Sequence, residues 1–325
     1  MPGTNTRFTP LWTDRPDAAE ILANKMTAGE LSPQLAERLK QLIEYGFVVI
    51  PGAIDHQLAD QLLDEIARVT RQPDKFIARR ARAAYAHPSE DVARDKTFRI
   101  IDFHVNSHQA GKAIFCDAIA EVLSAVFQSP ANAFQCLTFN YGSQQSLHQD
   151  GAYVVVAEPL QFLASWIALE DVVEGSGELV YYPRSHRLDD FLFGDNDSKA
   201  WEPGVHGKEI HRVFLDSLIE RSEAAGLARQ AFLPKKGDAL IWASDLVHGG
   251  AKIEHDKTRK SIVTHYCPIG VKPKFSTFTN YFHLRQVSEK GYISSRHYDL
   301  RGGKGWFRKH YPVLAPKFMG AKEDS

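Results

Sequence analysis

The amino-acid sequence predicts a mainly β fold with flanking helices, whose core is a double-stranded β-helix (a jelly roll, cupin-like). Two patterns predict this fold class. In the second half of the chain, short apolar runs are separated by turns rich in Gly, Pro and Asp, and they lie at 162–169, 178–182, 239–242 and 261–266. Helical patterns fall mainly in the first third. We therefore expect N-terminal helices packed on one sheet of the core.

Caps and turns locate the elements of the first third. Ser32-Pro33 opens an amphipathic helical pattern that ends at Gly46, and Asp55 is placed to cap a second helix. A buried strand is expected between these helices, at 47–50. Further along, the pattern predicts a strand at 99–104, a helix at 113–127 and a strand at 133–140.

A single domain over residues 1–325 accounts for the whole pattern. We expect an irregular N-terminal arm at 1–30, a jelly-roll region that carries the chemistry at 47–268, and a C-terminal extension at 269–325. Residues near 187–230 form a long polar insertion. Its length suits a lid or binding loop, and a plain surface excursion accounts for it equally well.

The segment 72–96 is polar and basic, and we expect it to form a surface loop with a helical turn. Its Arg79, Arg80 and Arg82 have the charge to grip an anionic group of a substrate. A run of this kind more often forms only a solvated face.

Composition favours a small-molecule partner. Lys plus Arg (39) nearly cancel Asp plus Glu (40), so no strong field attracts nucleic acid or a membrane surface. No apolar run is long enough to span a bilayer, and the first residues lack a secretory apolar stretch, so we expect a cytoplasmic protein. Cys116, Cys136 and Cys267 are few and far apart, which indicates reduced thiols. No heptad indicates an oligomeric state.

Three residues have the pattern of a metal site. In His148-Gln149-Asp150 the two ligand side chains leave the same face of an extended segment and can converge on one ion. His248 follows an apolar strand and precedes two glycines, so it stands at a strand end. Two histidines and one carboxylate leave coordination positions free, which suits Fe(II) oxygenases. A zinc-dependent hydrolase can use the same three ligands.

A fourth residue favours the oxygenase. Arg259 lies eleven residues after His248, and we expect the turn between them to return the chain as an adjacent strand. A guanidinium there can bind the distal carboxylate of 2-oxoglutarate bidentately, and Ser261, on the same side, can add a hydroxyl. Taken singly, each residue has a plainer interpretation: a loop hydrogen bond, a buried histidine or a surface charge. A non-catalytic jelly-roll binding protein also stays open.

The motifs LHQDGAYV, FLASWIALEDVVEGSGELVYYPRSHR and GDALIWASDLVHGGAKIEHDKTRKSIV resemble the phytanoyl-CoA dioxygenase family of Fe(II)/2-oxoglutarate-dependent oxygenases, over most of 47–268. The resemblance implies iron at His148, Asp150 and His248, with 2-oxoglutarate held by Arg259. It implies looser roles beside 2-oxoglutarate for Trp166, Leu137 and Arg99. PRSH, at 183–186, replaces the family's Pro-Gly-Ser-His, so this turn is expected to differ.

The resemblance also implies a reaction. Fe(II), 2-oxoglutarate and dioxygen, with ascorbate as a helpful reductant, would hydroxylate or otherwise oxidise an unactivated C–H bond of a small molecule and release succinate and CO2. The protein then supplies geometry and a dry pocket, and no separate catalytic acid or base is required. Family substrates range over acyl-CoA, amino acids, osmolytes and natural products, so the motifs do not choose among them.

Overall fold

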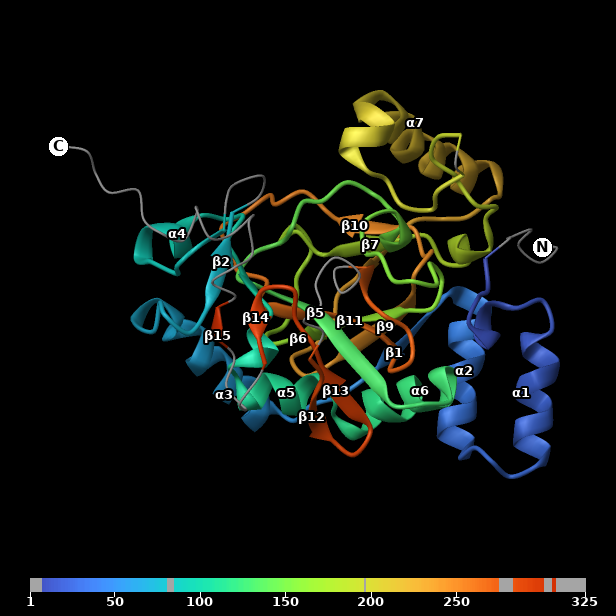
Figure 1. The fold of residues 1–325 in the computed structure, drawn as a ribbon, viewed down its shortest axis with the longest axis horizontal. Coiled ribbons are helices and arrows are strands. Elements are labelled where there is room, and N and C mark those ends of the chain that lie inside the picture. Colours follow the sequence, from blue (N-terminus) through green and yellow to red (C-terminus); the bar gives the residue numbers. More distant parts are fainter. Residues whose placement is uncertain (1–7, 81–84, 196, 275–282, 301–305, 308–325) are drawn as a thin grey trace.

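The computed structural model in Figure 1 describes residues 8–80, 85–195, 197–274, 283–300 and 306–307. Its centre is two facing sheets. The large sheet has the strand order β1-β9-β6-β11-β5-β4-β2-β3, the small sheet has the order β10-β7-β8, and β14 pairs with β15 separately. Most neighbouring strands in both facing sheets pair antiparallel, as in a jelly roll. The predicted fold class is therefore confirmed.

The large sheet is built from β1 (Phe47–Ile50), β2 (Ile77–Arg79), β3 (Tyr85–Ala86), β4 (Arg99–Ile101), β5 (Ala131–Phe139), β6 (Leu163–Ala168), β9 (Ala239–Ala243) and β11 (Ser261–Pro268), with β12 (Arg285–Ser288) and β13 (Gly291–Ile293) joined through β5. The small sheet is built from β7 (Leu179–Tyr181), β8 (Gln230–Phe232) and β10 (His248–Gly250). The remaining pair is β14 (Tyr298–Asp299) and β15 (Trp306–Phe307).

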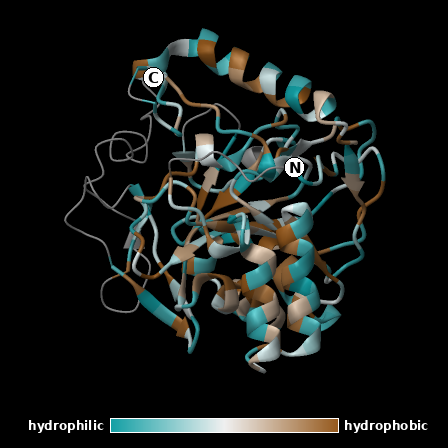
Figure 2. Cartoon of the chain, turned by 90° about the vertical axis from the view of Figure 1, so that its right-hand side faces the viewer, coloured by the Kyte–Doolittle hydropathy of each residue, from teal (hydrophilic) through white to brown (hydrophobic). Residues whose placement is uncertain are grey.

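The helices are α1 (Ala18–Thr27), α2 (Pro33–Tyr45), α3 (His56–Ala67), α4 (Glu90–Arg94), α5 (His108–Ile114), α6 (Asp117–Phe127) and α7 (Pro203–Ala224). Figure 1 shows α2, α3, α5 and α6 along the side of the large sheet that faces away from β7 and β10. In Figure 2, hydrophobic residues gather where these helices meet the strands, and hydrophilic residues lie on the outer sides. Within the described ranges, no helix combines the length and apolar character needed to cross a bilayer.

Alternation along β6 shows how the strands divide the core. Leu163 and Ile167 belong to the apolar cluster shared with the helices, whereas Ala164 and Trp166 belong to a second cluster shared with β7 and β8 of the small sheet. Successive residues of a strand point to opposite faces of the sheet, so β6 contributes side chains to both apolar clusters. The functional residues described below lie on the second face, between the two sheets.

Local sequence explains the helices that were predicted. The Ser32 hydroxyl accepts a hydrogen bond from the Leu35 amide (3.2 Å) at the start of α2, and Gly46 ends that helix in the left-handed region, with φ of 80°. The Asp55 carboxylate accepts from the Leu58 amide (2.7 Å) at the start of α3. Both helices and the strand β1 between them are confirmed.

Several predicted elements were wrong in detail. The arm at 1–30 is not irregular where it is described, because α1 occupies Ala18–Thr27 and Leu22 is buried. Its apolar positions are mostly alanines spread around the helix, so they give no clear helical period. The basic segment 72–96 contributes the short strands β2 and β3 as well as α4, and strands of two or three residues leave no readable alternation. The helix expected at 113–127 is two helices, α5 and α6.

Two expected turns also differ from the structure. The chain after β10 does not return as a neighbouring strand, because β10 pairs with β7 in the small sheet while β11 lies between β5 and β6 in the large sheet. The PRSH turn keeps a left-handed backbone although arginine replaces glycine, since Arg184 has φ of 72°. The Arg184 guanidinium pairs with Glu44 (2.5 Å), which helps to offset the cost of that conformation.

His186, in the same turn, should make stability depend on pH. Its Nε2 lies 3.3 Å from the Ile43 carbonyl, and burial, aided by the charge of Arg187, lowers the pKa of His186 from 6.5 to about 3. Below pH 6.5 the unfolded chain therefore binds more protons than the folded chain. The free energy of unfolding consequently decreases as the pH is lowered. From pH 6.5 to about pH 4.5 this loss should be about 2 kcal/mol.

Urea unfolding of the metal-free protein at these two pH values measures the loss. His186→Gln keeps a donor for the Ile43 carbonyl and removes the titrating ring. Between the two pH values, the free energy of unfolding of this variant should therefore decrease by about 2 kcal/mol less than that of the wild type. An equal fall in the two proteins would show that His186 does not titrate in this way.

Candidate metal centre

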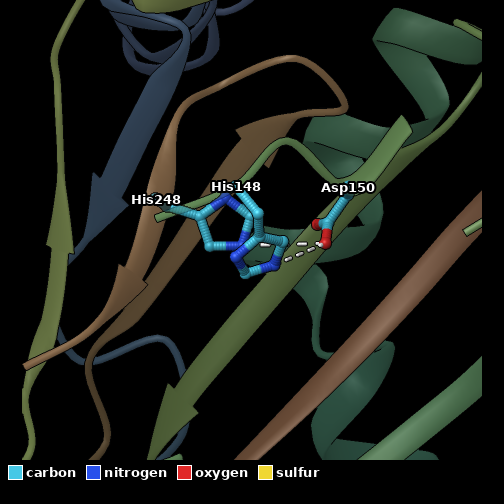
Figure 3. A group of neighbouring side chains, drawn as sticks. All are labelled: His148, Asp150 and His248. Atoms are coloured by element: carbon cyan, nitrogen blue, oxygen red, sulfur yellow. Dashed lines mark ion pairs between the residues drawn. The ribbon is translucent and has the colours of Figure 1, made fainter. Parts of the chain in front are cut away.

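His148, Asp150 and His248 come together between the sheets, as Figure 3 shows. Their ligand atoms all lie within 4.8 Å of one another, and each residue is about 5% exposed. His148 and His248 face each other across an isolated antiparallel bridge, with the His148 amide donating to the His248 carbonyl (2.8 Å) and the reverse bond at 2.9 Å. One backbone bridge thus positions two side chains that are a hundred residues apart in the sequence.

Both imidazole rings present the same nitrogen to the centre. The Nδ1 atoms lie 2.7 Å from the Ser146 carbonyl for His148 and 2.9 Å from the Leu246 carbonyl for His248. A carbonyl oxygen only accepts, so each Nδ1 carries the proton and each Nε2 keeps its lone pair. Hydrogen bonds of this kind orient metal-binding histidines in proteins. In the structure the Gln145 amide donates to the Nε2 of His148 (3.0 Å).

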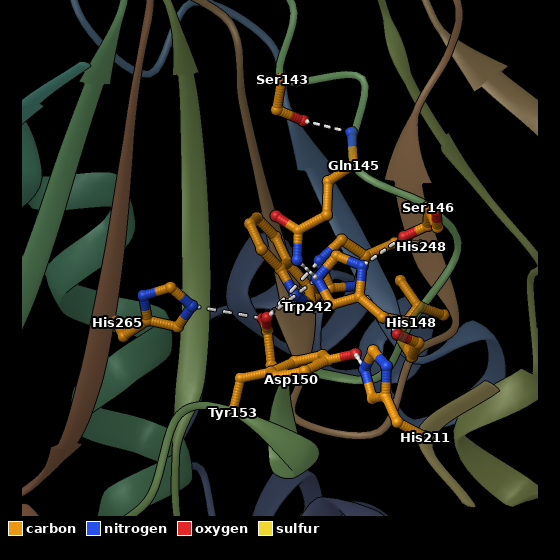
Figure 4. Close-up of polar contacts among 11 residues, drawn as sticks. Ser143, Gln145, Ser146, His148, Asp150, Tyr153, His211, Trp242, His248 and His265 are labelled. Carbon is orange, nitrogen blue, oxygen red and sulfur yellow. Dashed lines mark hydrogen bonds and ion pairs between the residues drawn. The ribbon is translucent and has the colours of Figure 1, made fainter. Parts of the chain in front are cut away.

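The two oxygens of Asp150 have different neighbours, which Figure 4 shows. Oδ1 faces the histidines, at 3.5 Å from the Nε2 of His148 and 3.7 Å from the Nε2 of His248. Oδ2 accepts a hydrogen bond from the Trp242 indole (2.9 Å) and lies 3.3 Å from the Nε2 of His265. One oxygen is therefore directed to the centre while the other is held by the large sheet.

Register in the large sheet explains how Asp150 is held. Trp242 on β9 and His265 on β11 both pair with Ala164 on β6, so the three residues form one row across the sheet. The small side chain of Ala164 leaves room between the two larger rings. Nothing local in the sequence points to Trp242, and for His265 it indicates at most a position facing the pocket from the strand of Arg259. The row itself depends on strand pairing between distant segments.

Electrostatics favour a charged carboxylate beside neutral imidazole. Burial alone would raise the pKa of Asp150, but the neighbouring His248 and His265 hold it well below its ordinary value. Burial lowers the pKa of His248 to about 4, against the opposing effect of Asp150. At neutral pH the centre therefore offers the anionic oxygen of Asp150 and the uncharged nitrogen of His248, the forms that bind a metal ion.

Trp242 should be needed for tight metal binding. Trp242→Phe keeps an aromatic ring in the core but removes the indole N–H that holds Oδ2 of Asp150. Loss of such an orienting contact should lower Fe(II) affinity by about 10-fold to 100-fold. Trp12→Phe is the matched control, because the Trp12 indole donates to the Ala125 carbonyl (3.1 Å), among the helices. Anaerobic metal titration of both variants tests this, and equal affinities would contradict it.

A cavity of about 630 Å³ adjoins the three residues, and Arg259, Trp166, Leu137 and Arg99 also line it. This volume is typical of pockets that hold a small organic ligand. Ser261 is buried, and its hydroxyl has no hydrogen-bond partner within the described ranges, but it does not line the cavity. The structure thus brings four of the five expected cosubstrate residues to one space.

Arg259 is the most unusual residue of the cavity wall. It is 2% exposed, its guanidinium lies 5.4 Å from the centroid of the Trp166 ring, and its Nε has no hydrogen-bond partner among the described residues. Burial lowers the pKa of Arg259 to about 10, with Glu178 opposing the shift, so the group remains a cation at neutral pH. No described carboxylate lies within ion-pair distance of it. Glu178 acts on this cation without forming an ion pair, so an anion that enters the cavity would stabilise Arg259 further.

Comparison with known proteins places the chain in a family. The family model "Phytanoyl-CoA dioxygenase (PhyH)" matches residues 42–261, about two thirds of the chain. The human peroxisomal phytanoyl-CoA dioxygenase is 27% identical over 124 residues, which are 38% of this chain and 33% of that protein. The Bos taurus enzyme is 25% identical over 124 residues, 38% and 34% of the two chains. The matched segment spans about a third of the length of these relatives.

Solved structures show the same fold at low identity. The epimerase SnoN from nogalamycin biosynthesis, in complex with Fe3+, alpha ketoglutarate and nogalamycin RO, superposes with a TM-score of 0.55 at 18% identity, covering 75% of this chain and 88% of SnoN. EctD from S. alaskensis, in its apoform, gives a TM-score of 0.52 at 17% identity, covering 74% and 78%. The resemblance predicted from the motifs is therefore confirmed, and the chain belongs to the phytanoyl-CoA dioxygenase family.

Proposed function

We propose that this protein is an Fe(II)- and 2-oxoglutarate-dependent oxygenase that hydroxylates a small molecule at an unactivated C–H bond. One observation carries the proposal. Three convergent metal-binding side chains share a cavity with Arg259, a buried cation that has no anionic partner among the described residues. A hydrolytic zinc site accounts for the ligands and leaves Arg259 unexplained.

The donors at His148, Asp150 and His248 fit iron. Two imidazole nitrogens and one carboxylate oxygen form the facial set that leaves positions open for a chelating cosubstrate and dioxygen. SnoN was crystallised with Fe3+ and alpha ketoglutarate, and EctD with bound Fe and with 2-oxoglutarate. These relatives in fold support the same pair of cofactors for this chain.

The cavity wall fits 2-oxoglutarate. The guanidinium of Arg259 can bind the distal carboxylate with two parallel hydrogen bonds, and the Trp166 ring beside it gives the chain of the cosubstrate an apolar surface. Arg99, whose Nε is also buried without a partner among the described residues, supplies a second positive charge. Leu137 adds an apolar contact. Ser261 stands behind this wall, so we assign it no contact with the cosubstrate.

Iron held by these residues, with 2-oxoglutarate and dioxygen, would supply the oxidising chemistry that converts a substrate C–H bond to an alcohol with release of succinate and CO2. The chain's residues hold the reacting groups and keep water away. Trp242 and His265 fix the orientation of Asp150, and the backbone carbonyls of Ser146 and Leu246 fix the two imidazole rings. No side chain is needed as a general acid or base for this cycle.

Hydroxylation is the finer part of the proposal. The fold also serves an epimerase, SnoN, and a carbocyclase, SnoK, from nogalamycin biosynthesis, so fold alone does not choose the outcome of the oxidation. Hydroxylation requires only the three ligands and a bound C–H bond, and nothing further in the cavity wall is needed for it.

Cosubstrate turnover tests the proposal before the substrate is known. The protein is incubated with Fe(II), 2-oxoglutarate, ascorbate and air, and succinate is measured against time. Slow succinate formation with Fe(II), and none with Zn(II), is the expected result. Hydrolysis of ester or amide substrates by the zinc-loaded protein, with no succinate from the iron-loaded protein, would overturn the proposal in favour of a hydrolase.

A further inference from the structure

We propose that Arg79 and His297 form a binding subsite for a carboxylate or phosphate group of the substrate. The subsite lies at the edge of the large sheet formed by β2 and β3, whereas the metal centre lies over β9, β6 and β11. Both residues line the same cavity as the metal centre. The word substrate here rests on the oxygenase function proposed above.

Two arginines stand directly opposite each other in this part of the sheet. Arg79 on β2 pairs with Arg99 on β4, and both line the cavity. Like charges directly opposite on neighbouring strands are destabilising. Among the described residues, no carboxylate lies within ion-pair distance of either guanidinium. If Arg99 serves 2-oxoglutarate, Arg79 still lacks an anion.

Of the basic run singled out in the sequence, Arg79 alone among the described residues faces the cavity. The neighbouring Arg80 lies 3.9 Å from Asp95, and its side chain is 50% exposed. Arg82 lies outside the described residues. A solvated face therefore describes Arg80, whereas Arg79 has the position of a ligand-binding group.

His297 provides a second, independent observation. It is 7% exposed, its Nδ1 lies 3.0 Å from the Oδ2 of Asp102, and its Nε2 is buried with no hydrogen-bond partner among the described residues. A nitrogen that is buried, unpartnered and in the wall of a cavity is unfavourable unless a ligand satisfies it.

Asp102 fixes the position of the His297 ring, so that its Nε2 is held in the cavity wall. The Oδ2 of Asp102 also accepts from the Ser295 hydroxyl (2.5 Å), and its Oδ1 accepts from the Cys136 amide (3.0 Å). Asp102 has φ of 49°, an uncommon backbone conformation for a residue other than glycine. Its carboxylate also lines the cavity, but it is engaged by these donors and by His297, and it forms no ion pair with Arg79 or Arg99.

Tyr85 joins the two groups. The Arg79 guanidinium lies 5.4 Å from the centroid of the Tyr85 ring, and the centroid of the His297 ring lies 4.9 Å from it. Contact with one aromatic ring restricts both side chains and lowers the entropy lost on binding an anion. The other walls of the cavity include apolar residues such as Phe134 and Val154, so the substrate should combine an anionic group with an apolar body.

Three probes that share one pentyl chain test the charge requirement: hexanoate, pentyl phosphate and hexanamide. Their binding is measured by calorimetry, without oxygen, on protein loaded with Fe(II) and saturated with 2-oxoglutarate, so that Arg259 and Arg99 are occupied. At least one anionic probe should bind about tenfold more tightly than hexanamide. The tighter of the two anions identifies carboxylate or phosphate as the group recognised.

The variants locate the effect. Arg79→Gln should remove the preference for the anion, and His297→Gln should reduce it, while the affinities for hexanamide and for 2-oxoglutarate stay the same. Arg80→Gln, which removes the same charge one residue further along, is the matched control and should change nothing. Thermal unfolding shows that each variant is folded, and Arg79→Lys, which retains a charge, should keep part of the preference.

Equal affinities for the three probes, or no binding of any probe at millimolar concentration, would overturn the subsite. A weakened 2-oxoglutarate affinity in Arg79→Gln would also overturn it, by placing Arg79 in the cosubstrate pocket. The same titration on metal-free protein separates the two proposals. If 2-oxoglutarate fails to bind the iron-loaded wild type, and if the anion preference persists in the metal-free protein and is lost in its Arg79→Gln variant, the oxygenase function fails and the subsite stands.

Discussion

Replacing Asp150 with alanine should abolish iron-dependent formation of succinate and weaken Fe(II) binding by more than about 100-fold. Loss of a residue that only orients a metal ligand usually weakens binding by no more than about 100-fold, so loss of a ligand itself should exceed that effect. The reason is that two imidazoles remain from a set of three donors. The change also leaves the Trp242 indole and His265 without the carboxylate that they contact. Anaerobic calorimetry with Fe(II) gives the affinity, and a succinate assay gives the activity.

Asp171→Ala is the matched control for Asp150→Ala. The Asp171 carboxylate is exposed, and its salt bridge to Lys235 (3.1 Å) lies on the surface. This control should bind iron and form succinate as the wild type does. Full activity in Asp150→Ala, in protein shown to be folded by circular dichroism, would remove Asp150 from the metal site.

Replacing Arg259 with methionine should weaken 2-oxoglutarate binding by about 100-fold or more, since two hydrogen bonds to a carboxylate are lost in a buried setting. The same change should leave the stability of the ligand-free protein unchanged or raise it. An unpaired buried cation is unfavourable, and methionine fills a similar volume without charge. Loss of binding together with a maintained melting temperature would separate a binding role for Arg259 from a structural one.

Two further variants make the Arg259 result specific. Lys257→Met removes an exposed positive charge two residues away and should affect neither cosubstrate affinity nor stability. Arg259→Lys keeps the charge and loses the planar fork, so its 2-oxoglutarate affinity should lie between those of the wild type and Arg259→Met. An unchanged 2-oxoglutarate affinity in Arg259→Met would show that the cosubstrate binds elsewhere.

Features with a local cause could be predicted from the sequence. The caps at Ser32 and Asp55 set the starts of α2 and α3, and each acts within three residues of its own position. The convergence of His148 and Asp150 could be predicted because residues two apart in an extended segment have their side chains on the same face. The position of His248 at a strand end could be predicted because an apolar run followed by two glycines is also a local signal.

Features that depend on long-range register could not be predicted. Trp242 and His265 hold Asp150 because both lie beside Ala164 on a strand far from either in sequence. The opposition of Arg79 and Arg99 depends on the pairing of β2 with β4, and β2 is only three residues long. The separation of β10 from β11 into two sheets is equally a property of the whole fold, since the turn between them reads like that of a hairpin.

The most direct test of the central claim is an anaerobic titration of metal-free protein with Fe(II) and then with 2-oxoglutarate, followed by visible absorption. We expect the weak charge-transfer band of the iron chelate to appear in the wild type, and to be absent from Arg259→Met at the same 2-oxoglutarate concentration. A protein that binds Fe(II) and never develops the band at saturating 2-oxoglutarate would contradict the assignment of this cavity to the cosubstrate.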